Sequence, residues 1–251
     1  MIQLRPRLAE VQLAVMLLTR LPAGRMAVAP SIGAAAWAFP LVGGVVGGVS
    51  AAVLLAAMAV GIAPGMAAGI ALAAGILATG GLHEDGLADV ADGFGGGRDR
   101  ARKLEIMRDS RIGSYGGLAL ILSLGLRWQA IALLTVESPK LGAFALIALA
   151  VSSRAGLPLA LLWMPAARTD GMGKSASGTT RARALISVAI AALALAVLVG
   201  PAEALTVMVV QAVVQLAFAR LALRQIGGQS GDVLGAMQQL AEITGWLMLT
   251  R

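Results

Sequence analysis

The chain has 251 residues, of which 58% are hydrophobic and only 13% are charged, and its mean hydropathy of +0.84 excludes a water-soluble domain. It contains no cysteine, which excludes disulfides and thiol chemistry and leaves oxygen ligands or the single His83 for any metal ion. The net charge of +7 does not indicate nucleic-acid binding, because the basic residues are confined to short segments between apolar runs.

The N-terminal segment predicts a helix that lies at the membrane surface. Leu4, Leu8, Val11, Val15 and Leu18 recur at helical spacing, and charged and polar residues interrupt the run between them. A secretory signal peptide has an unbroken apolar region, so this segment is expected to remain as an amphipathic interfacial helix.

Seven later segments are long and apolar enough to cross a bilayer, whose core of about 30 Å needs roughly 20 helical residues. They cover residues 32–60, 66–82, 115–136, 141–163, 184–200, 204–222 and 233–250, the fifth being short and the last the least apolar. Pro40 is expected to kink the first, where Gly43, Gly44, Gly47 and Gly48 allow close helix approach. The fold class is therefore an all-α polytopic membrane bundle, with residues 1–251 forming one domain.

The basic residues predict the orientation of this bundle. Three charged loops, 83–114, 164–183 and 223–232, alternate with very short connections. The side that contains these loops and the N-terminus carries sixteen Lys and Arg residues, whereas the other side carries only Lys140 and Arg251. The positive-inside rule therefore places the N-terminus and the three loops in the cytoplasm.

Three acids stand immediately after the second apolar segment. Asp85, Asp89 and Asp92 are spaced i, i+4, i+7, which places them on one face of a helix that is expected to continue out of the second span. Each like-charge pair destabilises even an exposed helix by roughly 0.2–0.5 kcal/mol. A Mg²⁺ ion that bridges to substrate phosphates would neutralise them. The alternative is a solvated helix whose acids pair with the basic segment that follows the glycines at 93–97.

Other ionisable residues fall in or near the predicted spans. Arg154 and Glu242 lie inside spans, where a charge is costly, so each is expected to face the protein interior as an interhelical partner or an active-site group. Asp232 opens the last span and can reach the same border as the three acids. Lys174 lies in a Gly-Lys-Ser sequence at 173–175, which lacks the first glycine of a P-loop because position 168 is arginine.

The sequence resembles the cobalamin synthases, the adenosylcobinamide-GDP ribazoletransferases. The resemblance rests on "HEDGLADVADGFGGG", then "RARKLEIMRDSRIGSYG", "SRAGLPLALLWMPAARTDGMG" and "GGQSGDVLGA", and it extends over nearly the whole chain from "LTRLP" at 18–22. It implies a multi-pass enzyme of the cell inner membrane that requires Mg²⁺. The enzyme would transfer adenosylcobinamide phosphate from its GDP-activated form to α-ribazole or α-ribazole 5'-phosphate, with release of GMP.

The shared helix face, the charges and the loop positions of the candidate residues suggest roles for them in such a reaction. Asp85, Asp89 and Asp92 are expected to bind the metal, and Asp109 or Asp232 to complete its shell or to act as the base for the ribazole hydroxyl. The expected substrate-binding residues are Arg108, Arg111, Lys174, Arg154 and Glu242, the first three as holders of diphosphate oxygens. A homo-oligomer through the glycine face, a CDP-alcohol-type membrane phosphotransferase and a secondary transporter remain open, although the acids lie at the border and not at the midplane as in transporters.

Overall fold

The computed structural model describes residues 4–168 and 179–251, and within these ranges its regular structure is helical, apart from one isolated β-bridge between Ala166 and Gln229. The helices are α1 (Leu4–Leu18), α2 (Ile32–Ala35), the 3-10 helix η1 (Ala36–Ala38), α3 (Phe39–Ala59), α4 (Pro64–Thr79), α5 (Leu82–Gly96), α6 (Arg100–Ile106), α7 (Ser114–Glu137), α8 (Pro139–Ala155), α9 (Leu157–Trp163), α10 (Arg181–Leu198), α11 (Pro201–Ile226) and α12 (Gly231–Leu249). The predicted all-α class is confirmed.

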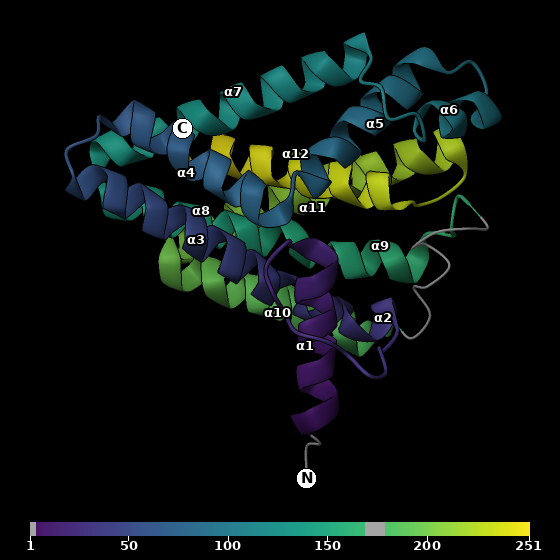
Figure 1. The fold of residues 1–251 in the computed structure, drawn as a ribbon, viewed down its shortest axis with the longest axis horizontal. Helices are drawn as coiled ribbons and strands as arrows, with labels where there is room; N and C mark the ends of the chain where they lie inside the picture. The colour runs from purple at the N-terminus through teal and green to yellow at the C-terminus, as the bar shows by residue number, and fades with distance from the viewer. Residues whose placement is uncertain (1–3, 169–178) are drawn as a thin grey trace.

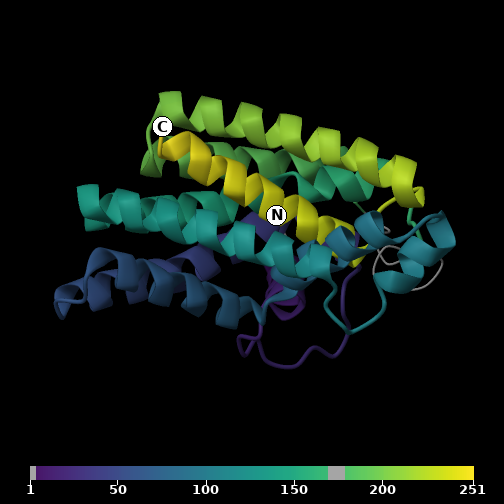
Figure 2. The same ribbon diagram turned by 90° about the horizontal axis from the view of Figure 1, so that it is seen from above.

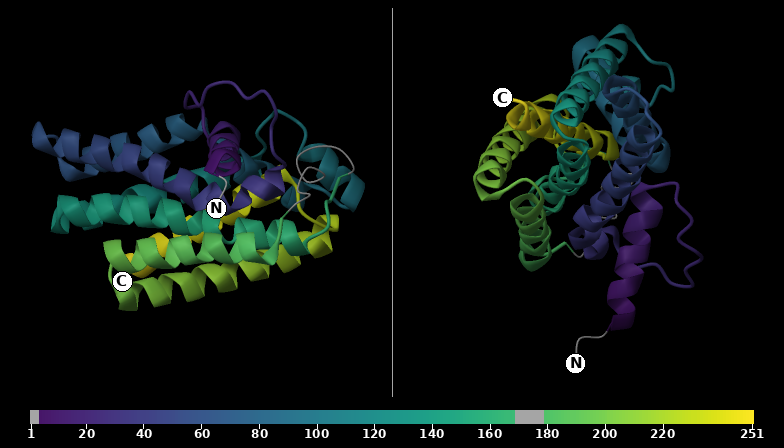
Figure 3. Two further views of the ribbon diagram at one scale, coloured as in Figure 1. Left: turned by 90° about the horizontal axis from the view of Figure 1, so that it is seen from below. Right: turned by 90° about the vertical axis from the view of Figure 1, so that its left-hand side faces the viewer.

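The long helices run side by side along the longest axis of the molecule, and α1 lies across them (Figures 1 and 2). Such a crossing is compatible with a helix at the membrane surface. The end-on view in Figure 3 shows α12 among the other long helices, while α1 stands apart from them. The described parts of the three charged loops gather at one end of the bundle, at the right in Figure 1, and the short connections lie at the other.

Helices occur at all seven predicted spans, but not every one has the length and composition of a span. In the described residues, five qualify: Ile32–Ala59, Ser114–Glu137, Pro139–Trp163, Arg181–Leu198 and Pro201–Ile226. A sixth is obtained if α4 and α5 form one broken span. The seventh segment, α12, is a helix whose interior-facing Gln238, Gln239 and Glu242 reduce its hydropathy.

The glycines of the first span bring α3 close to α8. A Cβ atom at Gly43 would lie 2.1 Å from the backbone oxygen of Ala150, and one at Gly47 would lie 2.7 Å from the Cα atom of Ile147. The close approach predicted from the GxxxG patterns is therefore used within the chain. Just before Pro40 the helix changes from the 3-10 helix η1 to α3, while the kink expected at Pro40 itself stays a prediction.

The prediction that the acidic helix continues straight out of the second span is wrong. Two consecutive glycines, Gly80 and Gly81, adopt left-handed conformations with φ of 69° and 73°. The amide of Gly80 donates to the oxygen of Leu77 and that of Gly81 to the oxygen of Ile76, which is a Schellman ending. This ending terminates α4, and α5 begins at an angle of 87° to it.

Candidate active site

The three acids of the stripe lie on a single helix, α5, as predicted, but their environments differ. Asp85 is exposed, Asp89 is half-buried, and Asp92 retains 9% of its accessible surface. Among the described residues, no basic side chain forms an ion pair with any of them within 4 Å. The alternative in which these acids pair with the following basic segment is therefore not what the structure shows.

Asp92 caps the N-terminus of α7. Its Oδ2 atom accepts a hydrogen bond from the amide of Gly113 at 2.7 Å, and its Oδ1 atom accepts one from the amide of Gly116 at 2.8 Å. A carboxylate is favourable there because it satisfies free amides at the positive end of the helix dipole. Both oxygens of Asp92 are thus engaged, which leaves Asp85 and Asp89 as the acids of the stripe without a hydrogen-bond donor in the described residues.

A close helix crossing brings a fourth acid to α5. A Cβ atom at Gly86 would lie 2.8 Å from the backbone oxygen of Asp232, and one at Gly235 would lie 3.4 Å from the Cα atom of Gly86. Glycine at both positions therefore permits the start of α12 to pack against α5, between Asp85 and Asp89 in sequence. The prediction that Asp232 reaches the same border is confirmed.

Asp232 also contacts groups outside α5. Its Oδ2 atom accepts a hydrogen bond from the hydroxyl of Ser230 at 3.2 Å and lies 3.5 Å from the Nη2 atom of Arg168. Arg168 itself donates to the backbone oxygen of Leu104 at 3.2 Å, which links the end of α6 to the site. One guanidinium thus stands beside a group of carboxylates that it only partly neutralises.

Asp89 carries the largest resolved pKa change of this group. Burial first, and then the charges of Asp85, Asp232 and Asp92, together raise the pKa of Asp89 to about 7, while Arg168 opposes them. The pKa of Asp232 is raised as well, mainly by burial. Neighbouring carboxylates with raised pKa values favour either a shared proton or a bound cation.

The sequence predicts a Mg²⁺ site formed by Asp85, Asp89 and Asp92, and the structure supports only part of this ligand set. No group of three or more His, Asp or Glu residues in the described part of the chain is arranged to hold a metal ion, and both oxygens of Asp92 are occupied by amides at the start of α7. Mg²⁺, however, commonly takes one or two carboxylates and completes its shell with water and substrate phosphates. Asp85 and Asp89, whose oxygens accept no hydrogen bond from described residues, suit that role.

The basic segment after α6 forms its own ion pair. The guanidinium of Arg111 donates to both carboxylate oxygens of Asp109 at 2.6–3.1 Å. This exposed pair lowers the pKa of Asp109 to about 2. Asp109 is thus engaged in the loop where Arg108 also lies, whereas Lys174 falls outside the described residues.

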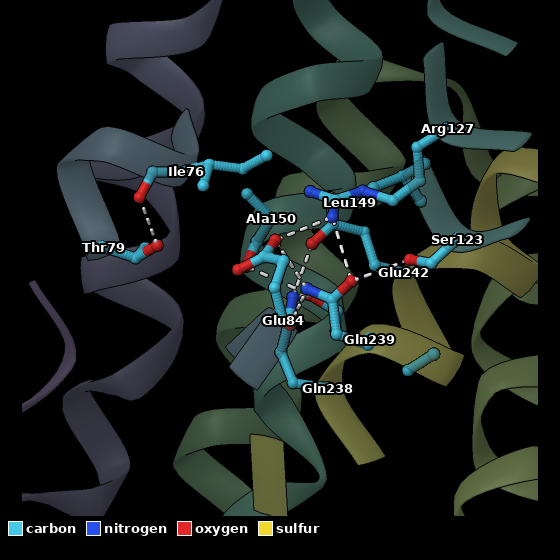
Figure 4. Close-up of polar contacts among 12 residues, drawn as sticks. Ile76, Thr79, Glu84, Ser123, Arg127, Leu149, Ala150, Gln238, Gln239 and Glu242 are labelled. Atoms are coloured by element: carbon cyan, nitrogen blue, oxygen red, sulfur yellow. Dashed lines mark hydrogen bonds and ion pairs between the residues drawn. The ribbon is translucent and has the colours of Figure 1, made fainter. Parts of the chain in front are cut away.

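Glu242 lies in a buried polar cluster inside the bundle (Figure 4), and Arg154 lines the same small cavity as Glu242. Arg127 of α7 stands at the centre of the cluster, with Nη1 2.8 Å from Oε1 of Glu84 and Nη2 3.0 Å from Oε1 of Glu242. Gln239 donates to Glu84 at 3.0 Å and accepts from Arg127 at 2.9 Å. Arg154 donates to the backbone oxygen of Ala150 at 2.7 Å.

This cluster ties the catalytic candidate helix to the core. Glu84 precedes Asp85 on α5, and its ion pair with Arg127 holds the start of α5 between α7 and α12. Interhelical pairing of Glu242 is therefore observed, while a role of Arg154 or Glu242 in binding substrate stays a prediction.

Two residues of the site were not singled out from the sequence for it. Ser230 reaches Asp232 locally, as the N-cap of α12 two residues before it. Arg168 reaches Asp232 because residues 165–167 and 229 pair through the isolated bridge, with the amide of Gln229 donating to Pro165 and that of Ala167 donating to Gln229. Two short loops far apart in sequence carry no periodic signal for such a contact. The only sequence feature that points to the contact of Arg168 with Asp232 is the position of Arg168 just after the apolar end of a span.

Comparisons with known proteins show the family of the chain. The family profile described as cobalamin-5-phosphate synthase matches residues 10–250. An adenosylcobinamide-GDP ribazoletransferase of Bradyrhizobium diazoefficiens is 46% identical over 242 residues, which are 96% of this chain and 92% of the relative. One of Mesorhizobium japonicum is 43% identical over 96% of this chain and 93% of its own length. One of Shewanella pealeana is 41% identical over 69% of this chain and 68% of its own length. No solved structure matches significantly. The chain therefore belongs to the cobalamin-5-phosphate synthase family.

Proposed function

We propose that the chain transfers adenosylcobinamide phosphate from adenosylcobinamide-GDP to α-ribazole or α-ribazole 5'-phosphate and releases GMP. The observation that carries this proposal is the meeting of Asp85, Asp89 and Asp232 beside Arg168, in a chain that is 46% identical to a relative bearing that enzyme name. The same comparison disfavours a CDP-alcohol phosphotransferase and a transporter. The products are adenosylcobalamin or its 5'-phosphate.

We also propose that the enzyme lies in the cell inner membrane with its site facing the cytoplasm. The five apolar helices support a membrane location, and the gathering of the basic loops at one end supports the orientation through the positive-inside rule. Asp85, Asp89 and Asp232 belong to that same end, where water-soluble nucleotide substrates have access.

Asp85 and Asp89 would hold Mg²⁺, which when bound neutralises diphosphate charge and stabilises the transferring phosphoryl group. Asp92 supports this pair by fixing α5 against α7 through its two hydrogen bonds. Arg168 faces the same acids and supplies positive charge that substrate phosphate oxygens can share.

The transfer makes one bond and breaks one. The acceptor hydroxyl oxygen bonds to the phosphorus that carries the corrinoid, and the bond from that phosphorus to GMP breaks. The hydroxyl proton passes to Asp232, whose raised pKa makes it a better base than Asp109, whose pKa is about 2. No covalent enzyme intermediate is needed, because positioning and charge neutralisation account for such transfers.

The test is GMP release by purified protein with adenosylcobinamide-GDP and α-ribazole 5'-phosphate over a Mg²⁺ titration. Asp89→Asn should reduce turnover about 100-fold or more, since the metal contributes several kcal/mol of charge stabilisation. Glu105→Gln is the matched control, because Glu105 is an exposed acid of α6 that pairs only with Arg102 among the described residues. Near-normal turnover in Asp89→Asn would overturn the metal assignment, and release of CMP from a CDP-alcohol donor would overturn the substrate.

A further inference from the structure

A cavity adjoins the stripe of acids on α5, on the side of α1. It has a volume of about 540 Å³ and lies between the end of α1, the turn from α4 to α5, and the first turns of α7. Asp85 lines it from α5, and Arg20 lines it from the segment that follows α1. The remaining walls are mostly backbone and apolar side chains, among them Leu120 and Ile112.

Backbone contacts hold Arg20 at this place. Its amide donates to the oxygen of Ala78, at the end of α4, at 2.8 Å. The hydroxyl of Thr19 donates to the oxygen of Val15 at 2.8 Å and accepts from the amide of Leu21 at 3.1 Å, which fixes the exit from α1 on both sides of Arg20. Arg20 therefore sits at a defined position although its side chain is exposed.

The glycine turn makes room for the arginine side chain. A Cβ atom at Gly80 would lie 2.6 Å from the Nε atom and 2.8 Å from the Cγ atom of Arg20. The left-handed backbone that ends α4 thus also provides the surface along which Arg20 extends. A side chain at Gly80 would be both strained at φ of 69° and in collision with Arg20.

The guanidinium of Arg20 makes no hydrogen bond or ion pair with any residue that the structure describes. Arg20 and Asp85 line the same cavity without forming a salt bridge. An arginine whose backbone is held in place, and whose guanidinium has no partner among the described residues, is available to an anion that arrives from solution. A guanidinium presents parallel N–H groups that match two oxygens of a phosphoryl group.

We propose that Arg20 binds a phosphoryl group of a substrate in this cavity, next to the reacting groups on α5. The inference rests on the proposed function, and it adds a residue from outside the three charged loops to the site. The phosphoryl group is either the diphosphate of the donor or the 5'-phosphate of the acceptor, since both present the same oxygen chemistry. The cavity volume leaves space for the sugar or base attached to that phosphate.

Arg20→Ala is compared with Arg25→Ala, which removes the same charge five positions further along the same exposed segment. Arg20→Ala should raise KM for the phosphorylated substrate about 10- to 100-fold, the range expected for a hydrogen bond to a charged group, while Arg25→Ala leaves KM unchanged. A second variant, Ile112→Trp, narrows the cavity at an exposed loop residue and should raise the same KM.

Steady-state KM values for the separate substrates show which phosphate Arg20 binds. A rise of KM for α-ribazole 5'-phosphate but not for α-ribazole assigns Arg20 to the acceptor phosphate. A rise of KM for adenosylcobinamide-GDP with either acceptor assigns it to the donor diphosphate. Unchanged KM values for all three substrates in Arg20→Ala overturn the inference.

A binding readout separates this inference from the proposed function. Inorganic phosphate, added to metal-free protein, should raise the melting temperature of the wild type and of Arg25→Ala more than that of Arg20→Ala. Equal shifts in the three proteins overturn the role of Arg20 whatever the activity. If the wild type releases no GMP but phosphate stabilises it through Arg20, the proposed function fails while the phosphate site stands.

Discussion

A half-buried carboxylate that faces other carboxylates destabilises the fold whenever it is ionised and uncompensated. Asp89 is in this position, with its pKa raised to about 7 from an ordinary value of 3.8. Between these two values the folded state binds more protons than the unfolded state, so the free energy of unfolding decreases as pH rises and the stabilisation by the proton is lost above about pH 7.

Asp89→Asn should therefore be more stable than the wild type in the absence of metal. The difference in melting temperature should be larger at about pH 8.5 than at about pH 5.5, because only the wild type must ionise this group. Addition of Mg²⁺ should raise the melting temperature of the wild type but not that of the variant. Thermal unfolding in detergent with EDTA measures this, and a variant that is less stable than the wild type at high pH would contradict the placement of Asp89.

Asp232 and Asp109, the two candidates for the general base, differ in their surroundings. Asp232→Asn should reduce turnover about 100-fold or more, as expected for loss of a general base. Asp109→Asn should retain most activity, because Asp109 is occupied by Arg111 in an exposed loop. Rates of GMP release at saturating substrate give the comparison, and the opposite order of effects would exchange the two roles.

For single residues, the sequence predicts which side chains share a helix face better than it predicts which groups they contact. The spacing of Asp85, Asp89 and Asp92 correctly places them on one helix, because helical periodicity is a local property. It does not reveal that Asp92 caps α7, because that contact joins residues 21 and 24 positions apart and depends on how two helices meet.

At the scale of elements, the contact between α5 and α7 depends on a glycine, Gly116. A Cβ atom at Gly116 would lie 2.3 Å from the Oδ2 atom of Asp92 and 3.0 Å from the oxygen of Ala88, whereas one at the neighbouring Gly117 would meet nothing within 4 Å. Both glycines lie in the first turn of α7, but Gly116 is buried against α5 and Gly117 is only partly buried.

Gly116→Ala should lower the free energy of unfolding by about 1–3 kcal/mol, the usual cost of overpacking. Gly117→Ala should leave it unchanged or raise it by up to about 1 kcal/mol, because alanine favours the helix over glycine. Denaturant or thermal unfolding in detergent gives both values. Equal effects of the two substitutions would mean that Asp92 does not hold the start of α7.

The elements show where sequence patterns stop being sufficient. The apolar runs predict the spans to within a few residues, since run length is a direct consequence of bilayer thickness. The 87° bend between α4 and α5 is not predicted, because a glycine pair inside an apolar run is compatible with a continuous helix as well as with a Schellman ending.

At the scale of the whole molecule, the absence of cysteine makes the orientation directly measurable. Arg98→Cys lies in the loop between α5 and α6, and Lys140→Cys lies at the start of α8, at the opposite end of the bundle (Figure 1). In spheroplasts, a membrane-impermeant maleimide should label Lys140→Cys at once and Arg98→Cys only after permeabilisation. The reverse pattern would place the acid site outside the cytoplasm.

The buried cluster around Arg127 has a consequence for how the chain is assembled in the bilayer. Helices enter in chain order, so Glu84 is already present when Arg127 arrives on α7, but α8 then adds Arg154 before the second carboxylate of the cluster is available. That second carboxylate, Glu242, comes only with α12. The two arginines of the cluster are therefore matched by two glutamates only after α12 has entered, and a nascent chain that lacks α12 retains an excess positive charge within its apolar core. Insertion of α12 is thus the step that balances the buried charges.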